Sequence, residues 1–136
     1  MIREIIHDPL FLAQPSAEAT EADLPIAEDL IDTLKANLDR CVGMAANMIG
    51  KKKRIIVMAR GPMVVAMLNP KIIGKSGEYE TEEGCLSLEG TRKTKRYRSI
   101  RLEWQDVQMK VHTGTLDGFQ AQIVQHEIDH CDGKLI

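Results

Sequence analysis

Three observations predict an α+β fold, in which mostly antiparallel β-sheets pack around a C-terminal helix and one further helix lies nearer the N-terminus. First, an apolar stripe with helical spacing begins at Pro25. Second, several short apolar or alternating segments between residues 55 and 111 have the period of β-strands. Third, a helical pattern follows the turn at Asp117 and Gly118. This order of helix, strands and helix is typical of α+β domains.

The individual elements follow from apolar spacing and from turn residues. Residues 1–24 look irregular, because Pro9 and Pro15 interrupt any period. The first helix presents one apolar face, made of Ile26, Ala27, Leu30, Ile31, Leu34 and Leu38. Strands are expected at Ile55–Ala59, Met63–Leu68 and Ser99–Trp104, with Met109 and Val111 in a partner strand. Gly133 is placed to end the last helix.

Length and composition restrict the class of protein. A chain of 136 residues suits one domain with one modest core. Hydrophobic residues make up 43% and charged residues 28%, as in soluble globular proteins. The net charge of -2 gives no general attraction to nucleic acid or membranes, so we expect no membrane association and no specific DNA binding.

The expected compartment is the cytoplasm. No apolar run approaches the roughly 20 residues needed to span a bilayer, and acidic residues near the N-terminus argue against a secretory signal. The three cysteines are odd in number and widely spaced, which favours reduced thiols over a disulfide framework.

The last helix carries the pattern H-E-x-x-H, formed by His126, Glu127 and His130. Histidines four positions apart project from one face of a helix, so both can bind the same ion. Glu127 lies about a quarter-turn away and can reach a water on that ion. The pattern therefore predicts a metal-binding helix and metal-assisted hydrolysis. The alternative is a surface helix with two solvated histidines.

A catalytic metal site needs a third protein ligand and one open position. Downstream of His130, the candidates Cys131 and Asp132 are too close in sequence to fold back onto the ion easily. The third ligand is therefore expected upstream. Cys85 is the best candidate, because a thiolate binds borderline metals strongly. The alternative for a lone cysteine is a small buried apolar side chain.

The motifs together resemble those of the peptide deformylase family. Residues 83–87 match its E-G-C-L-S motif, and residues 125–130 match its Q-H-E-x-D-H motif. A third family motif, G-x-G-x-A-A-x-Q, maps onto residues 41–48 with two departures. The three motifs keep the family's order and extend over essentially the whole chain, so residues 1–136 are interpreted as a single deformylase-like domain.

The resemblance implies a metal-dependent hydrolase that removes the formyl group from the N-terminal formylmethionine of nascent polypeptides and releases formate. Cys85, His126 and His130 would hold one divalent ion, usually Fe(II) in the family, with Zn, Ni or Co as alternatives. Glu127 would accept and return the proton, and the backbone N–H of Leu86 would face the developing oxyanion. The implied partners are a formylmethionyl peptide or nascent chain and, transiently, the ribosome.

The methionine side chain of such a substrate needs an apolar pocket. Phe119 and Ile123 share a face of the last helix with the first histidine, and Val42 is expected on the opposite wall. Gly43 and Gly84, from the first and second motifs, are also assigned to substrate binding. The alternative for the two helical residues is core packing, and one residue can do both.

The first motif departs from the family at two positions. Cys41 replaces its first glycine, and Met48 stands where the family has a glutamine whose amide donates to the oxyanion. A thioether has no donor, and loss of one such donor elsewhere slows the reaction by about a hundred- to a thousandfold. Asn47 and Gln122 are nearby amides that substitute only in part, and Asn47 is expected to point elsewhere.

A further departure follows the second motif. Tyr97 occupies a position where the family often has an arginine that helps to hold the peptide. The basic residues around it are interpreted chiefly as solvated charges on a hairpin, with binding of a peptide carboxylate or ribosomal RNA as the alternative; they are Arg92, Lys93, Lys95, Arg96 and Arg98.

Two functional hypotheses follow. The intact ligand set and Glu127 favour an active deformylase, whereas Met48 favours a catalytically weak or inactive paralogue that binds metal and formyl-peptides. A general metallopeptidase is disfavoured, because no suitable ligand lies downstream of His130.

Overall fold

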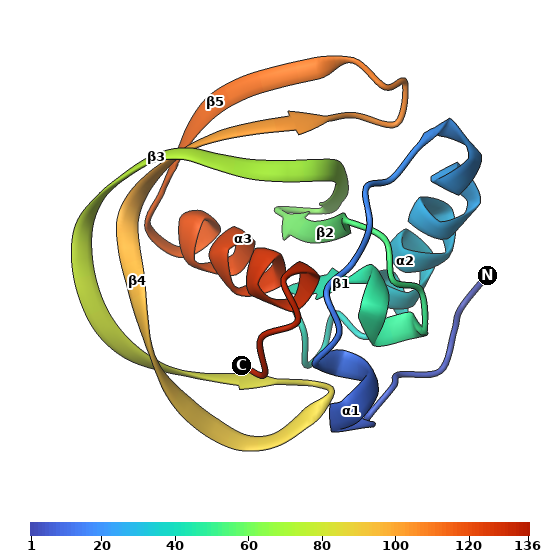
Figure 1. Ribbon diagram of the computed structural model, residues 1–136, viewed down its shortest axis with the longest axis horizontal. Coiled ribbons are helices and arrows are strands. Elements are labelled where there is room, and N and C mark those ends of the chain that lie inside the picture. The colour runs from blue at the N-terminus through green and yellow to red at the C-terminus, as the bar shows by residue number, and fades with distance from the viewer.

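The computed structural model describes all 136 residues and confirms the α+β fold (Figure 1). Its helices are α1 (Pro9–Leu12), α2 (Leu24–Ala36) and α3 (Gly118–Cys131), with short 3₁₀ helices at Glu21–Asp23 and Ala46–Ile49. Its strands are β1 (Gly43–Ala45), β2 (Ile55–Arg60), β3 (Met63–Cys85), β4 (Leu88–Gln105) and β5 (Val111–Asp117). No helix is long and apolar enough to cross a membrane.

The five strands form one sheet in the order in which they occur in the sequence, and each pairs antiparallel with the next. Strands β3 and β4 are long and arch around α3 in the centre of Figure 1. Their pairing runs from Leu68 opposite Gln105 down to Cys85 opposite Leu88, with three register shifts that let the ribbon bend. The sheet therefore carries Cys85 to the side of α3.

The β3–β4 ribbon extends much further than the sequence indicated. Only Met63–Leu68 and Ser99–Trp104 were expected there, because the residues between them lack an apolar alternation. Opposite charges face each other across this part instead, with Glu80 opposite Lys95 and Glu82 opposite Lys93. Such cross-strand pairs stabilise strands whose outward face is polar. The inward side is polar as well, since Glu83 and Arg96 are buried there.

Strand β2 is buried on both of its faces, which places α2 and α3 on opposite sides of the sheet. Ile55 and Val57 join a core cluster beneath α2 that includes Leu30 and Leu34. Ile56 and Met58 join a second cluster beneath α3. Successive side chains of a strand point to opposite faces, so a continuous apolar run is what such a strand requires.

Helix α3 is an interior helix rather than a surface one. His126 is 8% exposed and His130 is fully buried, which excludes the alternative of two solvated histidines. The expected end of the helix is confirmed at Gly133, whose φ is 75° and whose N–H donates to the carbonyl of His130. A side chain at Gly133 would lie 2.6 Å from the carbonyl oxygen of Ala13, so the N-terminal segment also requires glycine here.

The expectation that residues 1–24 are irregular was wrong for two short stretches, α1 and the 3₁₀ helix at Glu21–Asp23. Asp8 caps α1 by accepting a hydrogen bond from the backbone N–H of Leu10, and Pro9 occupies the first helical position. The cap and the proline were visible in the sequence, but a four-residue helix is too short to show a period.

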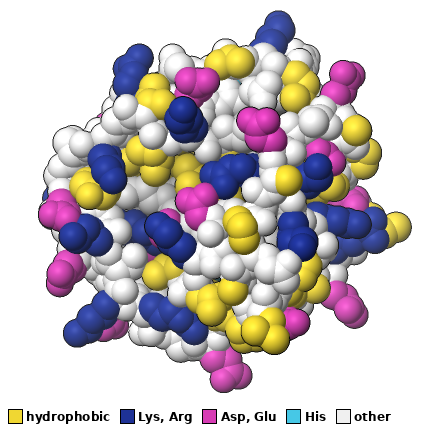
Figure 2. Space-filling model, viewed as in Figure 1, with side chains coloured by type: hydrophobic (Ala, Val, Ile, Leu, Met, Phe, Trp, Pro, Cys, Tyr) yellow, Lys and Arg dark blue, Asp and Glu magenta, His cyan; other side chains and the backbone are white.

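The surface in Figure 2 mixes charges of both signs. Side chains of Lys and Arg are interspersed with those of Asp and Glu on this face, and apolar side chains lie between them. This pattern agrees with the small net charge of the chain.

Asn69 joins the N-terminal segment to the sheet at the bend of β3. Its backbone φ is 51°, a left-handed conformation that asparagine tolerates better than most residues. The side-chain oxygen accepts from the N–H of Ala19 at 2.8 Å, and the amide nitrogen donates to the carbonyl of Ala19 at 2.9 Å. The same nitrogen donates to Gln105 at 2.7 Å.

Asn69→Ala should lower the free energy of unfolding by about 2 to 3 kcal/mol, because three hydrogen bonds are lost at a left-handed position. Asn69→Gly loses the same bonds without the backbone strain and should cost about 1 kcal/mol less than alanine. Urea unfolding with an unchanged m-value measures both changes. Equal losses in the two variants would show that the left-handed conformation contributes nothing.

Candidate active site

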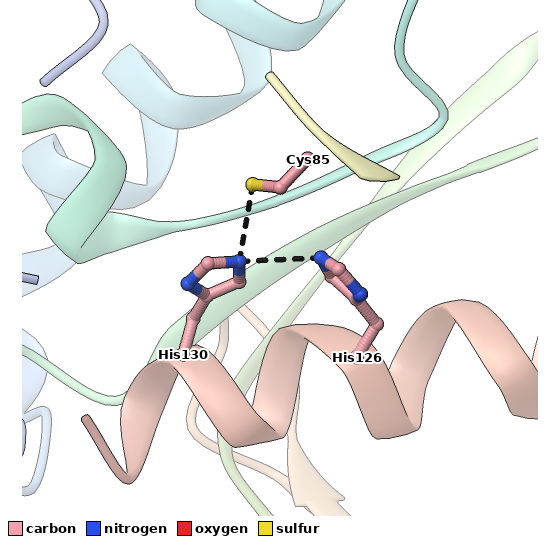
Figure 3. A group of neighbouring side chains, drawn as sticks. All are labelled: Cys85, His126 and His130. Atoms are coloured by element: carbon pink, nitrogen blue, oxygen red, sulfur yellow. Dashed lines mark hydrogen bonds between the residues drawn. The ribbon is translucent and has the colours of Figure 1, made fainter. Parts of the chain in front are cut away.

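Three potential metal ligands converge between the end of β3 and α3, as Figure 3 shows. Cys85 is the last residue of β3, and its sulfur lies 3.2 Å from Nε2 of His130. Nε2 of His130 lies 3.2 Å from Nε2 of His126. All three ligand atoms fall within 4.8 Å of one another, so the predicted residues are brought together.

The protonation of the two imidazoles suits a cation at this place. Nδ1 of His126 lies 2.8 Å from the Glu83 carboxylate, which can only accept, so Nδ1 carries a proton and Nε2 faces the other ligands. Burial would lower the pKa of His126, but the neighbouring Cys85 and Glu83 raise it to about 10. Burial and the charge of His126 lower the pKa of His130 to about 3.

This donor set fits a divalent ion. With both imidazoles neutral, two Nε2 lone pairs and one sulfur face the same small space, and only a cation satisfies all three together. Nitrogen and sulfur ligands of this kind bind Zn, Fe, Co and Ni. A cation here would replace the proton that His126 otherwise holds, since metal ligands must be deprotonated.

Glu83 links the sheet to α3, the helix that carries the two histidine ligands. Its carboxylate is buried and accepts from Nε and Nη2 of Arg96, from His126, and from the Gln122 amide at 2.9 Å. Burial opposes ionisation, but the hydrogen bonds from His126, Arg96 and Gln122 outweigh it and lower the pKa of Glu83 to about 2. The sequence analysis assigned Glu83 to a motif without giving it a role.

The guanidinium of Arg96 completes this network. The side chain is 4% exposed, and its Nη1 donates to Asp129 of α3 at 2.7 Å. The interpretation of Arg96 as a solvated hairpin charge was therefore wrong, because two carboxylates, Glu83 and Asp129, replace its water.

Glu127 stands beside the ligands in a buried position. The residue is 5% exposed, and its Oε1 is buried without a hydrogen-bond partner. Burial raises the pKa of Glu127 to about 7, against the opposing charge of His126. The carboxyl group can therefore both accept and return a proton near neutral pH.

A cavity of about 740 Å³ opens onto this group. Every predicted site residue except the fully buried His130 lines it: Val42, Gly43, Met48, Gly84, Cys85, Leu86, Phe119, Ile123, His126 and Glu127. Phe119 is 62% exposed and Val42 is 40% exposed, so both lie at the mouth, whereas Ile123 is buried within the core cluster beneath α3.

Gly43 fits tightly against α3. A side chain on Gly43 would meet Cγ2 of Ile123 at 2.7 Å and Oε2 of Glu127 at 2.9 Å. Only glycine therefore allows β1 to approach the helix at the carboxylate. Gly84 has no such constraint, since its closest neighbour would lie at 3.6 Å.

Comparison with known proteins agrees with this geometry. The family described as "Polypeptide deformylase" matches residues 2–136. The chain belongs to the peptide deformylase family. A peptide deformylase of Clostridium beijerinckii is 54% identical over 136 residues, covering 100% of both chains. One of Dictyoglomus thermophilum is 38% identical over 141 residues, covering 100% of this chain and 91% of the relative.

Solved deformylases share the fold as well as the motifs. The crystal structure of peptide deformylase from Thermotoga maritima superposes with a TM-score of 0.88 at 30% identity, covering 99% of this chain and 95% of that one. A deformylase from Acinetobacter baumannii with bound Met-ala-ser gives 0.88 at 27% identity, covering 99% and 97%.

In the present chain, an apolar side chain occupies the position where the family has a glutamine. Met48 is 1% exposed, and its sulfur lies 3.5 Å from the N–H of Ala45. Asn47 points elsewhere, as expected, and donates to the carbonyl of His130 at 2.9 Å. The Gln122 amide nitrogen is engaged by Glu83. Neither amide takes over the missing donor in this structure.

Tyr97 does not face the peptide site that the deformylase motifs define. It lines a second cavity, of about 800 Å³, on the other side of α3 together with Gln125 and Asp129. Arg96, its neighbour on the strand, points instead to Glu83, since successive side chains of a strand point to opposite faces.

Cys85→Ala should abolish stoichiometric metal binding, because it removes the only ligand that β3 supplies. The matched control is Cys41→Ala, which removes another half-buried thiol from the same cavity but none of the three ligands. Elemental analysis of anaerobically purified protein measures the metal content. Retention of one ion per chain in Cys85→Ala would exclude this cysteine as a ligand.

The stability of the metal-free protein should fall as the pH decreases from about 5 toward 2. The pKa of Glu83 is about 2 in the folded protein and near 4.5 otherwise, so its contribution is complete above 4.5 and disappears as the folded carboxylate is protonated. Glu83→Gln should flatten this dependence, and the exposed Glu80→Gln should not. Unfolding titrations at several pH values test this, and parallel curves for all three proteins would contradict it.

Proposed function

We propose that this chain is a metal-dependent hydrolase that removes the formyl group from N-terminal formylmethionine and releases formate. The observation that carries the proposal is the convergence of Cys85, His126 and His130 next to a buried, unpartnered Glu127. Membership of the peptide deformylase family supports the reaction, and the cavity of about 740 Å³ offers room for a peptide N-terminus.

Cys85, His126 and His130 would hold the metal ion, and we infer Fe(II), with Zn, Ni or Co as alternatives. When bound, such an ion stabilises negative charge on oxygen and makes a water more acidic. The protein's own contribution is to fix the ligands in advance. Glu83 orients His126 through Nδ1, and Asn47 holds the carbonyl of His130.

Glu127 moves the proton. With a pKa near 7, its carboxylate accepts a proton from the attacking water and its acid form returns the proton to the leaving amine. One group can serve both steps because burial keeps its pKa close to the working pH. The oxygen of the formyl group becomes negative as water adds, and the backbone N–H of Leu86 is assigned to it.

The substrate enters with its methionine toward α3. Ile123, Phe119 and Val42 give the pocket an apolar side, and Gly43 and Gly84 allow the peptide backbone to approach closely. The Acinetobacter baumannii structure contains Met-ala-ser. By similarity, we propose an extended formylmethionyl peptide or nascent chain as the partner here. The ribosome contact, expected from the resemblance, and the cytoplasmic location, expected from the composition, remain predictions.

The competing hypothesis is a weak or inactive paralogue, and Met48 is the observation in its favour. Full-length identity of 54% to a peptide deformylase argues against it. So does the position of Glu127, since an unpartnered buried carboxyl group lowers stability and has no structural purpose here.

Formate release from formyl-Met-Ala-Ser by anaerobically prepared Fe(II) or Ni(II) protein tests the function. Glu127→Gln should lower turnover by at least about a hundredfold while metal content stays the same. Glu89→Gln changes an exposed carboxylate near the start of β4; it is the matched control and should remain active. Undiminished turnover in Glu127→Gln would disprove its role, and a metal-loaded protein without turnover would favour the paralogue.

Met48→Gln should raise the turnover number by about tenfold or more, because it adds an amide donor at the wall of the cavity. The two side chains are similar in length, and the glutamine oxygen can accept from the N–H of Ala45 that now meets the sulfur. Met48→Leu keeps an apolar side chain of similar volume without a donor and should give no gain. Equal rates for the two variants would mean that the oxyanion already has its donors.

A further inference from the structure

A single arginine stands at the mouth of the active-site cavity without a carboxylate partner. Arg40 lies between α2 and β1, lines the cavity and is exposed. It forms no ion pair, whereas Arg54 pairs with Asp132, and Arg96 pairs with two carboxylates near α3. An unpaired guanidinium at this place is available to a ligand in the cavity.

Arg40 is held in a fixed orientation from behind. Its Nε and Nη2 donate to the side-chain oxygen of Asn37 at 3.3 and 2.9 Å. Asn37 is itself 9% exposed and donates to the carbonyl of Thr33 at 2.7 Å. The backbone N–H of Arg40 also donates to the carbonyl of Asn37 at 3.0 Å. The remaining guanidinium N–H groups are thus preorganised, which reduces the entropy lost on binding.

We propose that Arg40 determines sequence preference by binding an acidic side chain, Asp or Glu, at the second or third residue of the formyl-peptide. The inference rests on the proposed function. With methionine inside the cavity, the following residues of an extended chain advance by about 3.4 Å each and leave through the mouth. A carboxylate is the group that a guanidinium binds with two hydrogen bonds.

Two acidic residues at the mouth of the same cavity would repel an acidic side chain of the peptide. Asp39 and Glu82 line the cavity, are exposed and form no ion pair. The only side-chain hydrogen bond of Glu82 comes from Thr91 at 3.5 Å, so its carboxylate is not fixed as Arg40 is. The preference for acid should therefore be moderate, and removal of either negative charge should increase it.

The test compares amidated peptides, since a free C-terminal carboxylate would itself bind Arg40. The pairs are formyl-Met-Glu-Ser with formyl-Met-Lys-Ser, and formyl-Met-Ala-Glu with formyl-Met-Ala-Lys. We expect wild-type kcat/KM to favour Glu by about two- to fivefold in at least one pair, as for a partly exposed ion pair. The ratio should shrink in 0.5 M salt.

Arg40→Gln should remove the preference and Arg40→Glu should reverse it, whereas Glu82→Gln should increase it. Arg101→Gln is the matched control, because it removes one positive charge from the exposed sheet away from the cavity. A preference that survives in Arg40→Gln, or that Arg101→Gln also abolishes, would overturn the inference. Turnover of the neutral formyl-Met-Ala-Ser amide by wild type reports separately on the proposed function.

Discussion

The buried ion pair between Glu83 and Arg96 is the interaction on which the site depends. It joins β3 to β4, and through His126 and Asp129 it joins both strands to α3. Burying two charges is costly, and the cost is offset here because each group has several partners at hydrogen-bond distance. The same carboxylate that closes the curved ribbon also sets the proton on Nδ1 of His126. Folding of the sheet and preparation of the metal ligand are consequently one event.

Local patterns were enough to predict the parts of the site that lie on one element. The histidines and Glu127 of α3 follow from helical spacing, and Cys85 from the need for an upstream ligand. The Glu83–Arg96 pair could not be predicted, because its members are 13 positions apart and are not even opposite each other in the strand register, where Glu83 faces Arg92 and Arg96 faces Tyr79. The interpretation of Arg96 as a solvated charge was wrong for the same reason, since the carboxylates that replace its water come from two other elements.

The length of the β3–β4 ribbon escaped prediction for a related reason. An apolar alternation reports a strand with an apolar buried face, and the inward side of this ribbon carries polar residues instead, among them the buried Glu83 and Arg96. Its outward residues are largely charged, and Lys95 of β4 forms an ion pair with Glu78 of β3 at 2.7 Å. The core-forming strand β2, which packs on both sides, was visible in the sequence as a continuous apolar run. The sequence thus revealed the strands that bury apolar side chains, and it did not reveal those whose inward side is polar.

Met48 affects the stabilisation of negative charge in the proposed reaction more than it affects the shape of the site. Its side chain is fully packed and its sulfur meets the N–H of Ala45, so the cavity keeps its form without the amide. In the proposed reaction, the negative charge on the formyl oxygen would then have fewer donors, namely the backbone N–H of Leu86 and the ion that Cys85 and the histidines would hold. Because a protein donor is fixed whereas an ion differs in charge density and geometry from one metal to another, an enzyme with this substitution should depend more strongly on which metal it carries. The ratio of turnover numbers between metals, compared in wild type and Met48→Gln, is where that dependence would appear.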